Sequence, residues 1–210
     1  MSSIASAFDF TALSADEVST LKSGEVFITV RKGEELDHNP TVTRGGIEIM
    51  APSDIVLDLI KDCGKINEFS TDIRDCMILE ESPTGEYDIR KEKFAVSPFL
   101  PKFKSTFRTD YTTDESNNHI VKVTRISGDL KVQDARWDIL TLEPNKSRLI
   151  YQAAIKPSLP IPNRVIREQT AIGIPVILKN IRTVSEAHHE MNMKMKDLIK
   201  MDDLMPSDNE

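Results

Sequence analysis

Residues 149–188 read LIYQAAIKPSLPIPNRVIREQTAIGIPVILKNIRTVSEAH, and this stretch decides the fold. A strand-like run, 149–155, is followed by a loop with three prolines and then by an apolar helix pattern from Asn163 to His188. A helix of about 26 residues is about 39 Å long, which exceeds the width of a small domain. Its middle is apolar on nearly every side, and Gly173 and Pro175 predict a weakened or bent centre. Such a helix needs a large curved surface to lie in.

The rest of the chain supplies that surface as short strands. A capping box at Ser14–Glu17 opens a short helix, and the turn at Ala51–Ser53 opens a second one that Gly64 ends. From Thr71 onward, alternating residues between turn-like segments predict an antiparallel meander. The predicted strands are 25–30, 41–50, 73–81, 86–96, 103–112, 119–126, 132–142 and 148–155. This order predicts an α+β domain whose curved antiparallel sheet wraps around the long C-terminal helix, with short helices after the first strands.

Several short stretches resemble one known superfamily. They are Gly46–Pro52, Val56–Asp62, Asn67–Phe69, Gly128–Leu130, Ala135–Trp137 with Leu140, and Pro160–Asn163. In this order they resemble the START-like, helix-grip superfamily (SRPBCC), and within it the polyketide cyclase/dehydrase and lipid-transport type. The resemblance spans residues 25–188 and implies a cavity for a hydrophobic or amphipathic ligand between sheet and helix. Its members include lipid carriers, quinone-binding proteins and aromatase/cyclases, so it is specific for fold and not for activity.

The size and charge of the chain narrow the remaining classes. A chain of 210 residues suits one domain, and we expect an N-terminal extension with a short helix at 1–23, the START-like ligand-binding domain at 24–188 and a flexible tail at 189–210. The net charge of −7 argues against nucleic acid as a partner. The chain has no apolar run of about 20 residues and no secretory signal pattern at its start. We therefore expect a cytoplasmic protein.

The two cysteines predict no special chemistry. Cys63 and Cys76 are too few for a disulfide framework, and their spacing does not match a metal site. We expect two small thiols in the core or near the surface of the domain.

The sequence also lacks a recognisable catalytic set. The nucleophile elbow, the phosphate-binding glycine loop and the H-E-x-x-H pattern are absent. The adjacent His188 and His189 point about 100° apart on a helix, so they do not form a two-ligand metal face. We therefore predict no catalytic residue, no metal and no cofactor.

Alternation along the strands and the stripe on the helix predict the cavity wall. In the strand 132–142, Trp137 and Ile139 share the inner face, while Asp134, Arg136 and Asp138 face water. A few hydroxyl groups among apolar walls would suit an amphipathic ligand. The predicted cavity residues are Phe103, Phe107, Tyr111, Val121, Val123, Trp137, Ile139, Leu149, Tyr151, Ala153, Ile166, Thr170, Gly173 and Ile177.

The parity of the meander predicts a cavity mouth. Alternate connections of an up-and-down sheet lie at the same end, so the loops near 97–102, 127–131 and 156–162 should cluster beside the start of the long helix. The predicted mouth residues are Phe99, Leu100, Lys102, Leu159, Ile161 and Arg164. Exposed apolar tips ringed by Lys and Arg suit transient contact with an anionic membrane, or steering of an acidic amphiphile.

Three functions fit these features. The first is binding or transport of a lipid, fatty acid, quinone or similar molecule. The second is a cyclase/dehydrase-like enzyme that uses the same cavity, with Tyr151, Tyr111 or Arg90 assisting proton transfer. The third is an interaction module whose groove is filled by its own side chains.

Overall fold

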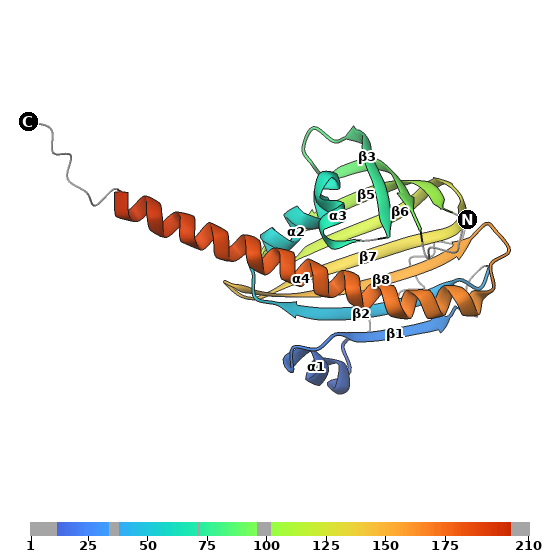
Figure 1. Ribbon diagram of the computed structural model, residues 1–210, viewed down its shortest axis with the longest axis horizontal. Helices are drawn as coiled ribbons and strands as arrows, with labels where there is room; N and C mark the ends of the chain where they lie inside the picture. The colour runs from blue at the N-terminus through green and yellow to red at the C-terminus, as the bar shows by residue number, and fades with distance from the viewer. Residues whose placement is uncertain (1–11, 34–37, 71, 96–101, 203–210) are drawn as a thin grey trace, which may run out of the picture.

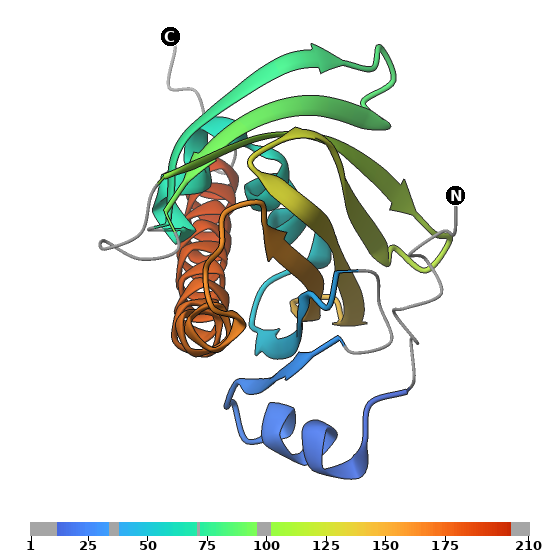
Figure 2. The same cartoon turned by 90° about the vertical axis from the view of Figure 1, so that its right-hand side faces the viewer.

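The computed structural model describes residues 12–33, 38–70, 72–95 and 102–202. Its core is an eight-stranded antiparallel sheet in the order β1-β2-β8-β7-β6-β5-β4-β3, curved around one long helix (Figures 1 and 2). The strands are β1 (Phe27–Lys32), β2 (Thr41–Ile49), β3 (Ile73–Glu81), β4 (Tyr87–Phe94), β5 (Phe103–Thr113), β6 (His119–Gly128), β7 (Leu130–Glu143) and β8 (Lys146–Pro157). The helices are α1 (Ala15–Lys22), α2 (Ser53–Lys61), the 3-10 turn η2 (Cys63–Lys65), α3 (Ile66–Phe69) and α4 (Asn163–Asp202). The helix-grip α+β prediction is confirmed.

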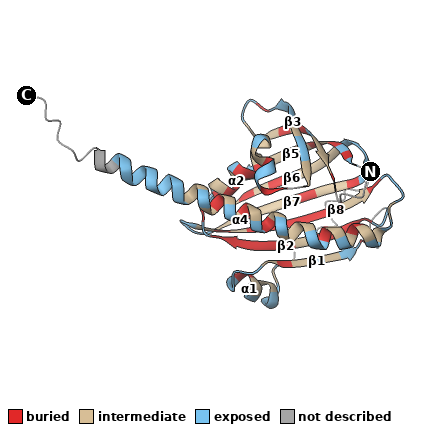
Figure 3. Ribbon diagram, viewed as in Figure 1, coloured by how far each residue is buried: buried red, intermediate tan, exposed pale blue. Residues whose placement is uncertain are grey.

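Helix α4 crosses the concave face of the sheet and then extends beyond it (Figure 1). It is continuous through Pro175. The predicted end at His188 is wrong, because the helix continues to Asp202. Met and Lys are good helix formers, and Lys194 pairs with Glu190 one turn away at 2.7 Å. The projecting segment is exposed (Figure 3), so local helix propensity rather than packing on the sheet maintains it.

The predicted parity of strand β7 is confirmed by its neighbours. Trp137 packs against Tyr151 on the concave face in a tilted arrangement, with ring centroids 4.2 Å apart. On the opposite face, Arg136 Nε donates to Asp138 Oδ1 at 2.9 Å. The inward positions therefore meet α4, and the charged positions pair with each other on the convex side.

One end of the interface between sheet and α4 is tightly filled. Its buried side chains come from β2, α2, β7, β8 and α4; they include Ile47, Ile49, Val56, Leu59, Ile139, Leu149, Leu178 and Ile181. At Gly45 of β2, an added Cβ would lie 3.3 Å from Leu178 Cδ1. The missing side chain therefore lets α4 approach the sheet closely at this end.

Helix α1 packs outside the grip, beside the β1 edge (Figure 2). The predicted capping box is present, since Ser14 N donates to Glu17 Oε2 at 2.8 Å and Glu17 N donates to Ser14 Oγ at 3.2 Å. Leu21 joins Phe27 and Ile150 in a small separate cluster. The proposed division at residues 23 and 188 stays a prediction.

The expectation of two free thiols is wrong. Cys63 and Cys76 form a disulfide, with Cα atoms 5.6 Å apart. The chain between them turns through α3 into β3, which brings two cysteines that are 13 residues apart into contact. Sequence spacing alone did not reveal this, because the turn that joins them has no pattern typical of disulfide-rich domains.

Candidate ligand-binding site

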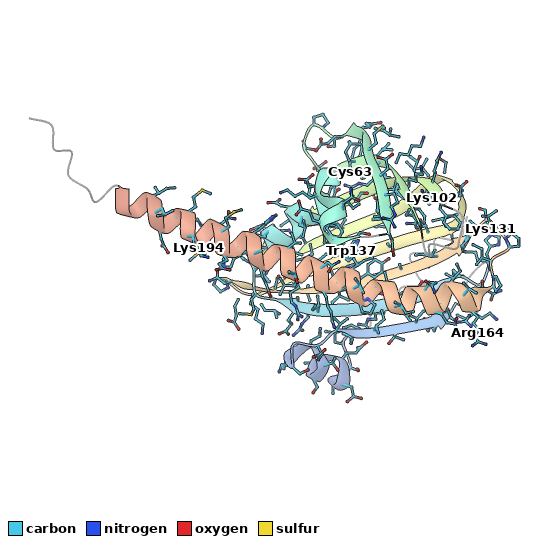
Figure 4. The ribbon with its side chains drawn as sticks, viewed as in Figure 1. Cys63, Lys102, Lys131, Trp137, Arg164 and Lys194 are labelled. Atoms are coloured by element: carbon cyan, nitrogen blue, oxygen red, sulfur yellow. A yellow bond between two sulfur atoms is a disulfide. The ribbon has the colours of Figure 1, made fainter. Side chains whose placement is uncertain are left out.

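A cavity of about 200 Å³ lies between the concave face and α4, next to the filled end. One water molecule needs only about 10–15 Å³ by a comparable measure, so the space can accept a small ligand. Its walls are mostly apolar and come from β4 to β8, from α4 and from the segment that links α2 to β3. The indole of Trp137 faces this space beneath α4 (Figure 4).

Eight of the predicted cavity residues line the cavity. They are Val121, Val123, Trp137, Tyr151, Ile166, Thr170, Gly173 and Ile177. They combine inward positions of three neighbouring strands with one face of α4. Periodicity identified them because these strands alternate cleanly between apolar inward and polar outward residues.

Six other predicted residues do not line it. Ile139 and Leu149 face inward but belong to the filled end, and Ala153, between the lining residues Tyr151 and Ile155 on β8, is completely buried. Phe103 and Phe107 are completely buried. Tyr111 instead directs its hydroxyl to Asp88. Alternation gives the face of a residue and not its position along the sheet, which explains why these residues lie outside the cavity wall.

Other lining residues were missed. They are Ile60, Ile66, Phe69, Ser70, Asp72, Ile73, Arg90, Glu92, Phe94, Thr109, Gln133, Ala135, Ile155, Pro157, Gln169 and Ile174. Residues 60–70, 72 and 73 form the roof, and Asn180 of α4 anchors this roof segment by donating to the carbonyl of Phe69 at 3.1 Å. For β4, the alternation of Asp88, Arg90, Glu92 and Phe94 was the available signal.

The inner face of β4 carries a buried polar network. Arg90 is 4% exposed and pairs with Asp88, to which its Nε donates at 2.8 Å. Its other contacts are the Tyr111 hydroxyl and the carbonyl of Lys61, which accepts from Nη2 at 3.1 Å. Burial is the main cause that raises the pKa of Tyr111. The guanidinium charge is thus largely matched by Asp88.

Glu92 stands apart from this network. Its carboxyl lines the cavity and makes no hydrogen bond to any residue that the structure describes. Burial raises its pKa to about 7, although the nearby Arg90 charge opposes the shift. Burial also raises the pKa of Tyr151, and the Glu92 charge adds to this effect. A carboxyl that changes charge near neutral pH therefore faces the ligand space.

Two of the three loops predicted to cluster, those near 127–131 and 156–162, meet beside the start of β5, whereas residues 96–101 of the third loop lie outside the described residues. Asp129 joins them, because its backbone N–H donates to the carbonyl of Lys104 at 2.9 Å and its carbonyl accepts from Ser158 N at 3.0 Å. Gly128 makes this possible, since its φ is +119° and an added Cβ would lie 2.3 Å from the Lys104 oxygen. Pro157 and Ile166 place this end next to the cavity.

The structure describes four of the six predicted mouth residues. Lys102, Leu159 and Arg164 are exposed, and Ile161 is half-buried; none of the four lines the cavity. Phe99 and Leu100 lie outside the described residues. Lys102, Lys131 and Arg164 gather at the same end of the molecule, opposite the projecting end of α4 that carries Lys194 (Figure 4). Their role as a mouth stays a prediction.

The described residues contain no group of three or more His, Cys, Asp or Glu side chains placed to hold a metal ion. Within the same part of the chain, every helix is too short or too polar to cross a membrane.

Solved structures share this fold at low sequence identity. The STAR-related lipid transfer protein of Xanthomonas axonopodis has a TM-score of 0.63 and 16% identity, covering 76% of this chain and 93% of that one. Human STARD10 has a TM-score of 0.67 and 12% identity, covering 88% and 84%. The ZhuI aromatase/cyclase of a Streptomyces species has a TM-score of 0.55 and 16% identity, covering 69% and 93%.

Sequence comparison gives the family. No curated protein matches the chain. A family model does match, over residues 49–180, and its description is polyketide cyclase / dehydrase and lipid transport. Because the match covers more than half of the chain and includes most of the cavity wall, the protein belongs to the polyketide cyclase / dehydrase and lipid transport family.

Proposed function

We propose that this protein binds a hydrophobic or amphipathic small molecule in the cavity under α4 and carries it without transforming it. The observation that supports this most directly is a mostly apolar cavity bounded by the sheet, α4 and the roof segment. Each methylene group that moves from water into such a site contributes about 0.8 kcal/mol. An alkyl or aromatic ligand is therefore the occupant that these walls favour.

Trp137 provides a direct test, because it is the single tryptophan of the chain and it lines the cavity. Titration with fatty acids, fatty alcohols and quinones should shift or quench its fluorescence in a saturable way. Native mass spectrometry of protein purified from its own host should show a co-purifying hydrophobic mass. Silence in both experiments would contradict the carrier proposal and favour the interaction module that the open cavity otherwise disfavours.

A cyclase/dehydrase-like enzyme is the second candidate, and Glu92 is the specific observation in its favour. A general acid or base works best when its pKa lies near the operating pH, and burial raises the pKa of Glu92 to about 7. Arg90 and Tyr151, both considered from the sequence, line the same cavity. Incubation with a poly-β-keto thioester mimic tests this; a cyclised or dehydrated product that is lost in Glu92→Gln would support catalysis.

We further propose that the end formed by the clustered loops makes transient contact with anionic membranes during loading or release. Lys102 and Lys131 gather there, and the exposed Leu159 directly follows Ser158, whose N–H donates to the carbonyl of Asp129. Lysines near an anionic surface contribute about 1 kcal/mol each. Vesicles containing anionic lipid should cosediment the wild type and a Lys194→Glu control, but bind the double variant Lys102→Glu/Lys131→Glu much less. Equal binding of all three proteins would oppose this contact.

A cytoplasmic location also remains a proposal, and the disulfide weighs against it. Cys63 and Cys76 form a disulfide, and structural disulfides form and persist mainly in oxidising compartments. Alkylation of free thiols in freshly lysed host cells distinguishes the cases. Two labelled cysteines would favour the cytoplasm, and none would favour an oxidising compartment.

A further inference from the structure

The cavity wall is polar on one side. Glu92 of β4, Thr109 of β5 and Gln133 of β7 all face the ligand space. The Thr109 hydroxyl and the Gln133 amide oxygen are buried without a hydrogen-bond partner among the described residues. Buried polar groups are normally hydrogen-bonded. This side of the cavity therefore has unused hydrogen-bonding capacity.

The charges around Glu92 decide which polar group fits there. On its own strand, Arg90 is already engaged by Asp88. The other titratable groups that line the cavity are Asp72, just before β3, and Tyr151 of β8. The residues paired directly with Glu92 carry no charge, because they are a disulfide cysteine on β3 and a serine on β5. The cavity side of α4 contributes only uncharged residues.

The cavity wall that the structure describes around Glu92 carries no uncompensated positive charge. Arg90 is offset by Asp88, and the carboxyl of Glu92 makes no hydrogen bond to a described residue. A second carboxylate beside an ionised carboxyl is unfavourable where water is scarce, while a hydrogen-bond donor is favoured. Glu92 can accept from such a donor in its ionised form, and it retains an acceptor oxygen when protonated.

We infer, resting on the proposed function, that the ligand presents a hydroxyl or an amine, and not a carboxylate, to Glu92 at the polar side of the cavity. Its alkyl or aromatic part lies along Trp137 and the apolar face of α4. The ligand class is thus a neutral or cationic amphiphile with a hydrogen-bond-donating head. A free fatty acid fits this wall less well.

The test compares three probes with the same tail and different heads: decan-1-ol, decylamine and decanoate. Trp137 fluorescence gives the apparent Kd of each at pH 6 and pH 8, for the wild type and Glu92→Gln. Glu115→Gln, in the exposed turn between β5 and β6, is the matched control. At pH 8 we expect the wild type to bind decanol and decylamine about tenfold more tightly than decanoate, the factor that corresponds to about 1.4 kcal/mol.

The pH and the variant should then change the order. Decanoate should bind the wild type better at pH 6, where Glu92 is mainly protonated, and Glu92→Gln should remove this pH dependence. The variant should also weaken decylamine binding, while Glu115→Gln behaves as the wild type. If the wild type binds decanoate more tightly than decanol and decylamine at both pH values, the inference is overturned and the head group is assigned to Arg90. This outcome needs only the wild type, so it holds even if Glu92→Gln fails to fold. Failure of all three probes to bind would instead overturn the proposed function as well.

Discussion

The two ends of the interface between α4 and the sheet differ sharply, although the same strands and the same helix form both. At the filled end, Ile139 and Leu149 of the sheet and Leu178 and Ile181 of α4 belong to one core cluster and have no exposed area. At the hollow end, α4 presents Thr170, Gly173 and Ile177 to the cavity. The fold itself therefore does not require a cavity.

The difference indicates a division of labour along one helix. At the filled end, α2 covers the sheet and contributes Val56 and Leu59 to the core. At the hollow end the covering segment is the short α3 turn, and the wall includes small or polar residues such as Ala135 and Glu92. Stability should depend mainly on the first end and ligand binding on the second. Substitutions with equal effects on stability and on ligand binding at both ends would contradict this.

The largest expected effect comes from a pair of adjacent residues on α4. Leu178 is completely buried in the filled end, so Leu178→Ala should lower the free energy of unfolding by about 3–4 kcal/mol. Ile177 lines the cavity, so its truncation removes fewer contacts, and Ile177→Ala should cost about 1 kcal/mol. Urea denaturation monitored by circular dichroism measures both. Equal losses would mean that the cavity collapses onto Ile177 in solution.

The disulfide tests how the roof of the hollow end is held. Cys63 lies beside α3 and Cys76 on β3, so the bond ties the roof segment to the sheet edge. Closing a loop of this size restricts the unfolded chain, and Cys63→Ser/Cys76→Ser should lower stability by about 3 kcal/mol. Trp137 emission should also shift towards the red as the roof loosens. Reduction of the wild type by dithiothreitol is the matched control, and an unchanged denaturation midpoint there would argue that the thiols are free in solution.

The sequence predicted the arrangement of helix and sheet better than the details of the interface between them. The apolar stripe on residues 163–188 and the turn-punctuated strands imply a helix gripped by a curved sheet, because neither surface can be left in water. Clean alternation on β7 correctly placed Trp137 inside and Arg136 outside. The longer extent of α4 was missed because the apolar stripe ends at His188, whereas Lys and Met continue a helix without it.

The polar side of the cavity could not be predicted in the same way. A charged residue on a strand normally indicates a solvent-facing position, so Arg90 and Glu92 read as surface residues although their strand is covered. Their inward direction depends on the pairing of β4 with β5 and on the curvature of the sheet, which places this strand over α3 and α4. The Cys63–Cys76 bond was hidden for the same reason, since it depends on how the chain turns between α2 and β3.

The stability of the fold should also depend on pH through Glu92. The pKa of Glu92 is raised from 4.5 to about 7 by burial, so the folded protein binds this proton more tightly than the unfolded chain. Below pH 4.5 Glu92 is protonated in both the folded and the unfolded state, so its titration does not change the free energy of unfolding. As the pH rises to 7 and above, ionisation of Glu92 lowers the free energy of unfolding. The full shift corresponds to about 3 kcal/mol, and water in the cavity should reduce this to about 2 kcal/mol.

Glu92→Gln isolates that contribution. The variant should be more stable than the wild type at pH 8 and similar to it at pH 4.5, whereas Glu115→Gln should follow the wild type throughout. Urea denaturation at both pH values measures the difference. Parallel curves for the wild type and Glu92→Gln would show that Glu92 is fully hydrated, and the hollow end would then be open to bulk water.

The smallest expected change in stability should accompany the largest change in binding. Ala135 of β7 and Ala153 of β8 lie directly opposite each other in the sheet, but Ala135 lines the cavity and Ala153 does not. Ala135→Leu places three carbon atoms in open space, so stability should change by less than about 1 kcal/mol. The same atoms occupy the ligand site, and decanol binding should weaken at least about tenfold, or by about 1.4 kcal/mol.

Ala153→Leu is the matched contrast, because the same side chain is added at a completely buried position that does not line the cavity. Overpacking there should lower stability by about 1–3 kcal/mol while decanol binding, measured by Trp137 fluorescence on the folded fraction, changes less than in Ala135→Leu. The reverse order, with binding lost in Ala153→Leu and kept in Ala135→Leu, would place the ligand against Ala153 and not in the cavity that Ala135 lines. Because the two positions are paired on neighbouring strands, the comparison tests which of two adjacent positions in the sheet the ligand contacts.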